Sequence, residues 1–313
     1  MDLTSKEAPL LRLGEALRAR GYEFTTPTPA THTRVNARAQ NREAKDLRDV
    51  FGWTRPFSRD VLPADIVALM RDAGILLKEN GLLRSALRVS SLGGELFFHS
   101  AFPTTEADAV FFGPDSYRFA RAIKAVLSER TAPIANAVDI GCGAGPGGIF
   151  VAKHAPEARV LMTDINESAL RLARVNAALA GTTKATALRS DILSEVDGAF
   201  DLIVSNPPYL NDALQRAYRH GGGDFGASLS LRILEATLPR LAPDGSLILY
   251  TGAAIVSGRD LFREAALPRL AEGDFAWTYE EVDPDVFGEE LETEAYCAAD
   301  RIAAVVLNVR KRN

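Results

Sequence analysis

One stretch near residue 205 constrains the fold of this chain more than any other. Residues 201–209 read Asp-Leu-Ile-Val-Ser-Asn-Pro-Pro-Tyr. The apolar run at 202–204 is typical of a parallel strand that is covered on both faces. Proline has no N–H to donate to a sheet, so the strand must end before Pro207. Asn206 and Tyr209 are therefore expected at the carboxyl edge of a parallel sheet, where open α/β folds bind ligands.

The Asn-Pro-Pro-Tyr sequence has the functional groups to hold an amino group. The Asn206 side-chain oxygen and the Pro207 carbonyl are two acceptors on a rigid frame, and together they can bind both hydrogens of an NH2 group. Such acceptors favour the pyramidal, attacking form of an amide or base nitrogen and stabilise its developing positive charge. Tyr209 offers a flat face on which a planar group can stack. The alternative is a plain proline-rich turn after a strand.

A glycine-rich loop precedes this stretch. Residues 137–148 read Ala-Val-Asp-Ile-Gly-Cys-Gly-Ala-Gly-Pro-Gly-Gly, which predicts a strand followed by a loop whose backbone can approach a ligand. The next predicted strand ends in Asp164, about 20 residues after the loop, a spacing typical of a carboxylate that binds ribose hydroxyls. A third predicted strand, at 185–189, leads to Asp191.

Two cofactors are compatible with this half of the chain, a nicotinamide cofactor and S-adenosylmethionine. The glycine loop alone does not distinguish them. The later Asn-Pro-Pro-Tyr favours methyl transfer, because a dehydrogenase has no use for a two-acceptor amine clamp at that position.

Together these motifs resemble those of class I S-adenosylmethionine-dependent methyltransferases of the amino-directed, Asn-Pro-Pro-Tyr group. The resemblance covers the chain from about residue 134 to 313, and it extends to release-factor glutamine methyltransferases and small-domain RNA methyltransferases. A glycine-rich segment at 220–226 is similar to one in the release-factor enzymes. The glycine loop is richer in glycine than in that family, and the N-terminal part departs further.

The resemblance implies an α/β fold with a doubly wound, Rossmann-like, seven-stranded sheet, and S-adenosylmethionine as the cofactor. It implies that Asp139 and the loop glycines line the methionine end of the cofactor, that Asp164 binds the ribose, and that Asp191 and Ile192 contact the adenine. The implied catalytic residues are Asn206, Pro207 and Tyr209, and the implied cofactor-binding residues are Asp139, Gly141, Gly143, Asp164, Ile165, Asp191, Ile192 and Asn206.

Composition is that of a globular protein. The chain has 313 residues, of which 47% are apolar and 25% charged, and this length suggests two domains. We expect an N-terminal helical, winged-helix-like recognition domain at 1–108 and the methyltransferase domain at 109–313. We expect neither a secretory signal nor a membrane span, because charged residues interrupt every apolar run. Two cysteines and no Cys/His cluster predict a reducing cytoplasm and no metal site.

The N-terminal region is predicted to be helical, with a hairpin at its end. The first helix carries leucines at helical spacing and ends near Gly21. The predicted elements after it are a loop at 24–33, helices at 34–50 and 64–73, and strands at 82–89 and 95–100. This order is similar to a winged helix, a shape that binds nucleic acid or docks proteins.

A basic stripe is expected on the helix at 34–50. Its members are Arg34, Arg38, Arg42 and Lys45. Residues 1–130 carry a net charge of +3, and residues 131–313 carry −8. A basic stripe can follow phosphates. Acidic residues nearby favour an ordinary solvated face instead.

The segment at 109–117 precedes a predicted helix. It is expected either to lie over the cofactor, as in similar methyltransferases, or to form a plain domain junction. Asp115 or Ser116 is expected to cap the helix, and Phe112 or Tyr117 to pack on the ligand.

Three segments after the amine clamp complete the prediction. A polar, glycine-rich stretch at 211–226 is expected to be a substrate loop. The acidic stretch at 280–300 is either an insertion near the active site or a surface loop. The strand at 302–309 is expected, by resemblance, to be the antiparallel edge of the sheet.

The predicted function is methylation of a planar amino group of a macromolecule by a cytoplasmic enzyme. Two acceptors stay open, a glutamine side chain in a protein and an adenine-type amino group in RNA or DNA. The alternatives from other classes are a dehydrogenase that uses a nicotinamide cofactor and a nucleotide-binding module without catalysis.

Overall fold

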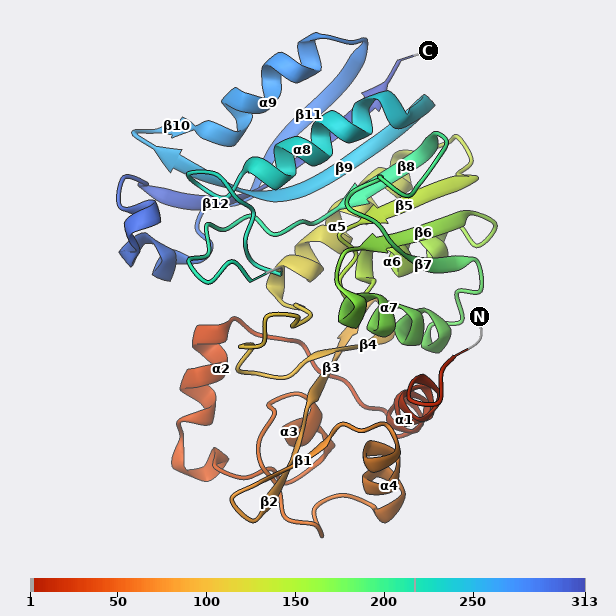
Figure 1. Cartoon of the computed structure of the whole chain (residues 1–313), viewed down its shortest axis with the longest axis vertical. Helices are drawn as coiled ribbons and strands as arrows, with labels where there is room; N and C mark the ends of the chain where they lie inside the picture. The colour runs from red at the N-terminus through yellow and green to blue at the C-terminus, as the bar shows by residue number, and fades with distance from the viewer. Residues whose placement is uncertain (1–2, 217, 313) are drawn as a thin grey trace.

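The computed structural model describes residues 3–216 and 218–312. Figure 1 shows two regions stacked along the long axis of the molecule. The first hundred residues, from red to orange, form the lower region, and the sheet with its helices forms the upper region.

The upper region contains the predicted seven-stranded sheet, in the order β11-β12-β9-β8-β5-β6-β7. The strands are β5 (Asn136–Ile140), β6 (Arg159–Asp164), β7 (Ala185–Arg189), β8 (Phe200–Ser205), β9 (Leu241–Val256), β11 (Phe275–Asp283) and β12 (Arg301–Lys311). The strands from β5 to β9 pair in parallel, and a short β10 (Arg259–Asp260) pairs with the end of β9. The prediction that the last strand forms the edge is wrong, because β12 lies between β9 and β11 and is antiparallel to both.

Helices cover both faces of this sheet, as the doubly wound prediction requires. They are α5 (Pro114–Glu129), α6 (Pro146–His154), α7 (Glu167–Leu179), α8 (Ser228–Thr237), α9 (Leu261–Ala271) and the 3-10 turn η2 (Leu238–Arg240). Strand β8 shows how the two faces divide. Leu202 and Val204 belong to the apolar core with α5, α6 and α7, whereas Ile203 belongs to the core with α8 and α9. Burial on both faces explains the continuous apolar run in the sequence.

The lower region consists of four helices and two hairpins. They are α1 (Glu7–Ala19), α2 (Pro29–Asn36), α3 (Leu47–Phe51), α4 (Ala64–Asp72), β1 (Leu76–Glu79), β2 (Leu82–Ser85), β3 (Leu87–Leu92), β4 (Glu95–Ser100) and the 3-10 turn η1 (Ala39–Asn41). The predicted first helix is confirmed, since Leu10, Leu13 and Leu17 are fully buried. The helix predicted at 64–73 is also confirmed as α4.

The single helix predicted at 34–50 is wrong. The chain begins α2 earlier, because the Thr28 side chain accepts a hydrogen bond from the Thr31 N–H and Pro29 occupies the first helical position. A second N-cap, Asp46, starts α3 separately by accepting from the Asp49 N–H. The basic residues between 34 and 45 therefore do not share one helical face.

The strand predicted at 82–89 is two strands. Residue 86 separates β2 from β3, and β2 pairs with β1 across a turn that holds Asn80 and Gly81 at positive φ. The second hairpin, β3–β4, is confirmed, with Gly93 and Gly94 in its turn.

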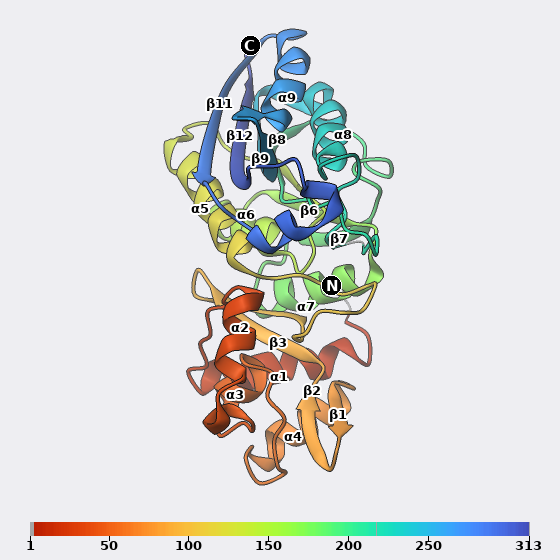
Figure 2. The same ribbon diagram turned by 90° about the vertical axis from the view of Figure 1, so that its left-hand side faces the viewer.

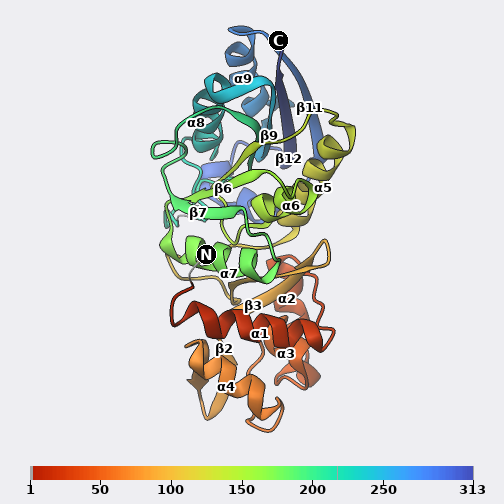
Figure 3. The same ribbon diagram turned by 90° about the vertical axis from the view of Figure 1, so that its right-hand side faces the viewer.

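The two regions pack against each other through α7. Figure 3 shows α1 beneath α7, and these two helices are in contact. The buried Asn176 of α7 accepts a hydrogen bond from the Phe98 N–H at 2.8 Å and donates to the Phe98 carbonyl at 3.0 Å. We propose a division into domains at residue 108.

Candidate active site

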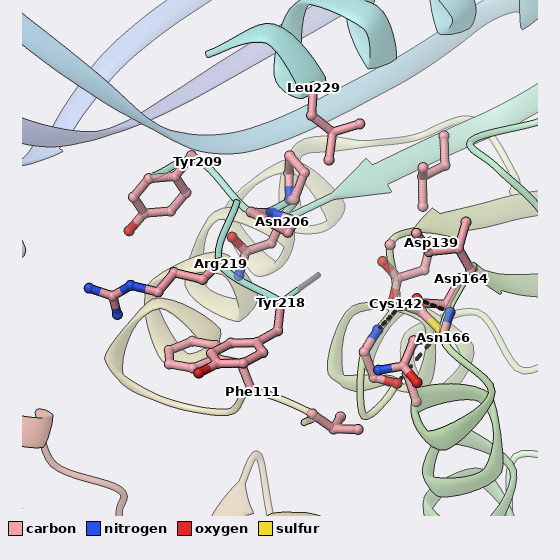
Figure 4. Close-up of a pocket in the computed structure, with 18 of the residues that line it drawn as sticks. Phe111, Asp139, Cys142, Asp164, Asn166, Asn206, Tyr209, Tyr218, Arg219 and Leu229 are labelled. Carbon is pink, nitrogen blue, oxygen red and sulfur yellow. Dashed lines mark hydrogen bonds between the residues drawn. The ribbon is translucent and has the colours of Figure 1, made fainter. Parts of the chain in front are cut away.

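A cavity lies at the carboxyl ends of the parallel strands, and it contains all of the predicted site residues. Its lining includes Asp139, Gly141, Gly143, Asp164, Ile165, Asp191, Ile192, Asn206, Pro207 and Tyr209. Figure 4 shows Asp139 and Asp164 on one side of this cavity, and Asn206 and Tyr209 on the other. We call the first side the carboxylate end and the second the amide end.

Asp139 lies at the centre of the carboxylate end, on β5. Its side chain is 1% exposed, and Oδ2 accepts a hydrogen bond from the Gly148 N–H at 2.7 Å. Burial, and to a lesser degree the neighbouring Asp164, raises the pKa of this carboxyl to about 7. A Cβ on Gly147 would lie 2.9 Å from Oδ2, so the start of α6 can approach Asp139 only as glycine.

Asp164, at the end of β6, accepts a hydrogen bond from the glycine loop. Its Oδ2 accepts from the Gly143 N–H and its Oδ1 from the Asn166 N–H, both at 2.9 Å. Burial raises the pKa of Asp164, and these backbone hydrogen bonds oppose that shift. Asn166 also caps α7 and lines the cavity, a position that the sequence reasoning missed.

The outer part of the carboxylate end combines apolar and charged side chains. Ile165 is 55% exposed, and Ile192 has a positive φ of 56°, which is rare for a β-branched residue and typical of strained functional positions. Asp191 is 60% exposed at its side chain and pairs with Arg232 at 3.2 Å. Both isoleucines line the cavity and offer it apolar side chains.

The amide end begins where β8 stops. The Ser205 hydroxyl donates to the Ile140 carbonyl at 2.8 Å and joins the end of β8 to β5. Asn206 follows, and the chain then turns at the two prolines so that Tyr209 points away from Asn206 (Figure 4). The Tyr209 hydroxyl donates to the buried carboxylate of Asp115 at 2.7 Å.

The segment at 109–117 contributes to the cavity with different side chains from those predicted. Phe111 lines it, whereas Phe112 stacks on His99 in the core and Tyr117 accepts a hydrogen bond from the Thr26 N–H. Ser116 caps α5 as expected, by accepting from the Gly113 N–H. The segment thus lies at the cavity, and it also connects the lower region to α5.

The loop at 210–226 and the acidic segment after β11 close the amide end. Tyr218 and Arg219 line the cavity, and so does Phe287, which precedes the 3-10 turns η3 (Gly288–Glu292) and η4 (Glu294–Tyr296). Arg219 forms an ion pair with Glu290, and its guanidinium lies 5.7 Å from the centre of the Phe287 ring. The acidic segment is therefore part of the cavity wall.

Sequence reasoning missed Phe111, Asp115, Tyr218, Arg219 and Phe287 as residues of the amide end. They come from three segments without regular hydrophobic periodicity, far apart in the chain. The one available signal was aromatic residues within otherwise polar, irregular stretches, which does not indicate where the side chains meet.

Comparisons with known proteins decide the family. The family described as Methyltransferase small domain matches residues 120–256. Residues 120–256 therefore carry a methyltransferase domain. This match agrees with the predicted family, which implies S-adenosylmethionine as the cofactor, and the sheet order agrees with the predicted α/β fold.

Similar curated proteins match this chain over part of their length. The chain is 41% identical over 119 residues to Ribosomal RNA small subunit methyltransferase C of Actinobacillus succinogenes, covering 37% of this chain and 32% of that protein. It is 36% identical over 167 residues to Ribosomal protein uL3 glutamine methyltransferase of Bordetella pertussis, covering 47% and 54%.

The name of a third relative indicates a small-molecule substrate. It is 4-amino-L-phenylalanine/4-methylamino-L-phenylalanine methyltransferase of Streptomyces pristinaespiralis, 31% identical over 171 residues, covering 51% of this chain and 55% of that protein. The chain thus spans between a third and just over half of these relatives.

Among solved structures, the tRNA m1G37 methyltransferase of M. jannaschii is similar to the methyltransferase domain in fold. The TM-score is 0.51 at 18% identity, covering 76% of this chain and 59% of that one.

No helix in the described ranges is both long and apolar enough to cross a membrane. Within the same ranges, no group of three or more His, Cys, Asp or Glu side chains could hold a metal ion.

Proposed function

We propose that this protein transfers a methyl group from S-adenosylmethionine to a planar amino nitrogen of a macromolecule. The observation that carries the proposal is the position of Asn206 and Pro207 at the end of β8, in the same cavity as the carboxylates Asp139 and Asp164. A methyl donor at the carboxylate end would face an amino group held at the amide end.

The carboxylate end has groups that suit each part of the donor. Asp164 and the glycine loop would take the ribose, and Asp139 with Gly141 and Gly143 would take the methionine portion, whose charges a buried carboxylate complements. Ile165 and Asp191, with Ile192, would take the adenine. The bound donor supplies an electrophilic methyl carbon next to its sulfonium.

At the amide end, Asn206 and Pro207 would hold the acceptor NH2 through its two hydrogens. Their oxygens favour the pyramidal nitrogen and stabilise its positive charge as the new carbon–nitrogen bond forms and the sulfur–carbon bond breaks. Positioning of the two reactants supplies much of the remaining rate enhancement. No general base is needed before transfer, because the nitrogen becomes acidic only after it carries the methyl group.

A base amino group in RNA is the acceptor that we favour. Arg34, Arg38, Arg42 and Lys45 are exposed, and their side chains have no hydrogen bond or ion pair with any other residue in the described ranges. Unpaired cations on a surface are suited to phosphates. Figure 2 shows α2, which contains Arg34, in front of the lower region, and the dark-blue segment before β12 in front of the upper region.

A protein glutamine is the second candidate acceptor. The glycine-rich segment at 220–226 is the feature that suggested it, but the fold itself requires these glycines. A Cβ on Gly221 would lie 2.7 Å from the Pro208 carbonyl oxygen, and one on Gly226 would lie 2.2 Å from the Tyr209 carbonyl oxygen. This loop must therefore approach the catalytic motif closely whatever the acceptor is.

An RNA acceptor would place the enzyme in the cytoplasm, where ribosomal and transfer RNAs are modified.

Transfer of a labelled methyl group tests the proposal directly. The purified protein is incubated with radiolabelled S-adenosylmethionine and a cell extract, and the product is digested separately with nuclease and with protease. We expect nuclease to release the label. Label released by protease would instead show that the acceptor is a protein. Label in neither fraction, with the donor shown to bind, would contradict a macromolecular acceptor.

A further inference from the structure

The tyrosine of the Asn-Pro-Pro-Tyr motif is buried and hydrogen-bonded within the protein. Its hydroxyl donates to Oδ2 of Asp115 at 2.7 Å, and the Tyr250 hydroxyl donates to Oδ1 of the same carboxylate at 2.7 Å. Asp115 is 4% exposed and also accepts from Arg118 at 3.1 Å. One buried carboxylate therefore accepts hydrogen bonds from two tyrosine hydroxyls and a guanidinium.

A glycine in the middle of β9 shows how closely the Tyr209 ring is packed. Glycine weakens the interior of a strand, and in such a place it often marks a close approach of another group. A Cβ on Gly252 would lie 2.2 Å from Cδ2 of Tyr209. Gly252 has no positive φ, so room for the Tyr209 ring is the reason for glycine here.

The Asp115 carboxylate is itself firmly anchored. It lies in the first turn of α5, where the N-terminal backbone N–H groups favour a negative charge. Arg118, one turn further along α5, also pairs with Asp283 at the end of β11 at 2.5 Å. The hydroxyl of Tyr209 is thus bound to a group that α5, β9 and β11 hold in common.

We propose that Asp115 is a positioning residue, which fixes Asn206 by holding Tyr209. This inference rests on the proposed function. The link between the two residues is stiff, because Pro207 and Pro208 each lock one backbone torsion. A displacement of Tyr209 would therefore move the Asn206 and Pro207 oxygens relative to the donor. Tyr209 serves as an anchor of the amide clamp, in addition to any stacking on the acceptor.

Removal of single hydroxyl or carboxylate groups tests this role. Tyr209→Phe keeps the ring and loses the hydrogen bond, and Asp115→Asn keeps the shape and loses one acceptor. We expect each variant to lower kcat about 10- to 100-fold, because misplacement by about 1 Å costs roughly that much. The donor Kd, measured by calorimetry, should stay within about twofold of the original value, because neither group belongs to the carboxylate end.

A matched control is available at the far side of the sheet. The Tyr279 hydroxyl donates to Oδ2 of Asp260 at 2.6 Å, the same chemistry, and neither residue lines the cavity. Tyr279→Phe should leave kcat unchanged. The double variant Asp115→Asn/Tyr209→Phe should be no slower than the worse single variant, because both changes break the same hydrogen bond.

Amide hydrogen exchange separates failure of this inference from failure of the proposed function. The Leu210 N–H bonds to the Arg219 carbonyl, and the Asn211 N–H bonds to the Tyr296 hydroxyl, so this stretch has protected amides to follow. Tyr209→Phe should accelerate their exchange more than about tenfold, and Tyr279→Phe should not. If the original protein transfers methyl groups, unchanged kcat in both test variants overturns the inference. If it transfers none, unchanged exchange overturns it.

Discussion

The two ends of the cavity are built in different ways. At the carboxylate end, three neighbouring strands stop together, and the glycine loop bonds to the side chains that follow them, as in the pair Gly143–Asp164. At the amide end, segments far apart in the chain meet through side chains. Tyr218 donates to the Thr104 carbonyl at 2.8 Å, 114 residues away in sequence, and Arg219 reaches Glu290.

This difference teaches how the two tasks of a methyltransferase are separated. The end proposed for the donor depends on backbone geometry within neighbouring parallel strands and the glycine loop. The end proposed for the acceptor depends on loops that are far apart in the chain. Relatives named for RNA, protein and amino-acid substrates each match this chain over only part of their length.

The largest expected effect is at the amide end. Asn206→Ala should lower turnover by about 10³-fold, since removal of one preorganised polar group at a reacting centre costs on the order of 10²–10³-fold and here both reactants lose alignment. The donor Kd should change less than about twofold. Calorimetry and a methyl-transfer assay on the same preparation measure both quantities. Asn136→Ala, at the opposite end of β5, is the control. A variant with normal turnover would remove the distinction between the two ends.

The next largest effect is at the carboxylate end. There we expect a change in donor affinity and little change in turnover. Asp164→Ala removes the acceptor of two backbone hydrogen bonds and of the proposed ribose contact. We expect the donor Kd to rise roughly 10- to 100-fold, because each hydrogen bond to a charged group contributes about 1.5–3 kcal/mol. At saturating donor, kcat should stay within a few fold. Asp197→Ala, an exposed carboxylate outside the cavity, controls for charge. A large loss of kcat with unchanged Kd would contradict the assignment.

A smaller effect concerns pH and the carboxylate end alone. The pKa of Asp139 is about 7, raised by burial, so this carboxyl is mostly neutral at pH 6 and mostly ionised at pH 8. If its charge holds the donor, affinity should increase roughly tenfold as the pH rises from 6 to 8. Calorimetric titrations at several pH values measure this change. Asp139→Asn should bind more weakly at pH 8 and show a flat profile. A flat profile in the unmodified protein would show that the charge is not used.

The smallest effect concerns the route by which the acceptor reaches the amide end. Replacing Arg34, Arg38 and Arg42 by glutamine should raise the KM for RNA roughly fivefold and make binding less sensitive to salt, because each arginine that no longer binds a phosphate reduces the log–log slope by about one. The donor Kd should not change. Titrations between low and moderate salt measure the slope. An unchanged slope would favour the protein acceptor.

Much of the fold and of the carboxylate end could be predicted from sequence, because the signals there are local. Strand β8 ends where Pro207 requires, and Asp139, Asp164 and Asp191 all reach the cavity because they lie at or just beyond the ends of adjacent parallel strands. In the lower region, the caps Thr28 and Asp46 were overlooked, and one helix was predicted where the chain forms two.

The amide end could be predicted only at its motif. Asp115 was expected to cap a helix, because an acidic residue at a helix start usually has that role. Its true partners, Tyr209 and Tyr250, lie 94 and 135 residues away in sequence, and no periodic pattern connects them. Contacts between such distant residues form only when the folded sheet and helices pack together, so a local sequence pattern does not reveal them.

A crystal structure with S-adenosylhomocysteine bound tests the central claim most directly. We expect its ribose hydroxyls within about 3.2 Å of the Asp164 carboxylate and its sulfur directed toward the Asn206 oxygen. A ligand whose sulfur points away from Asn206, or one bound outside the cavity between the two ends, would contradict the account.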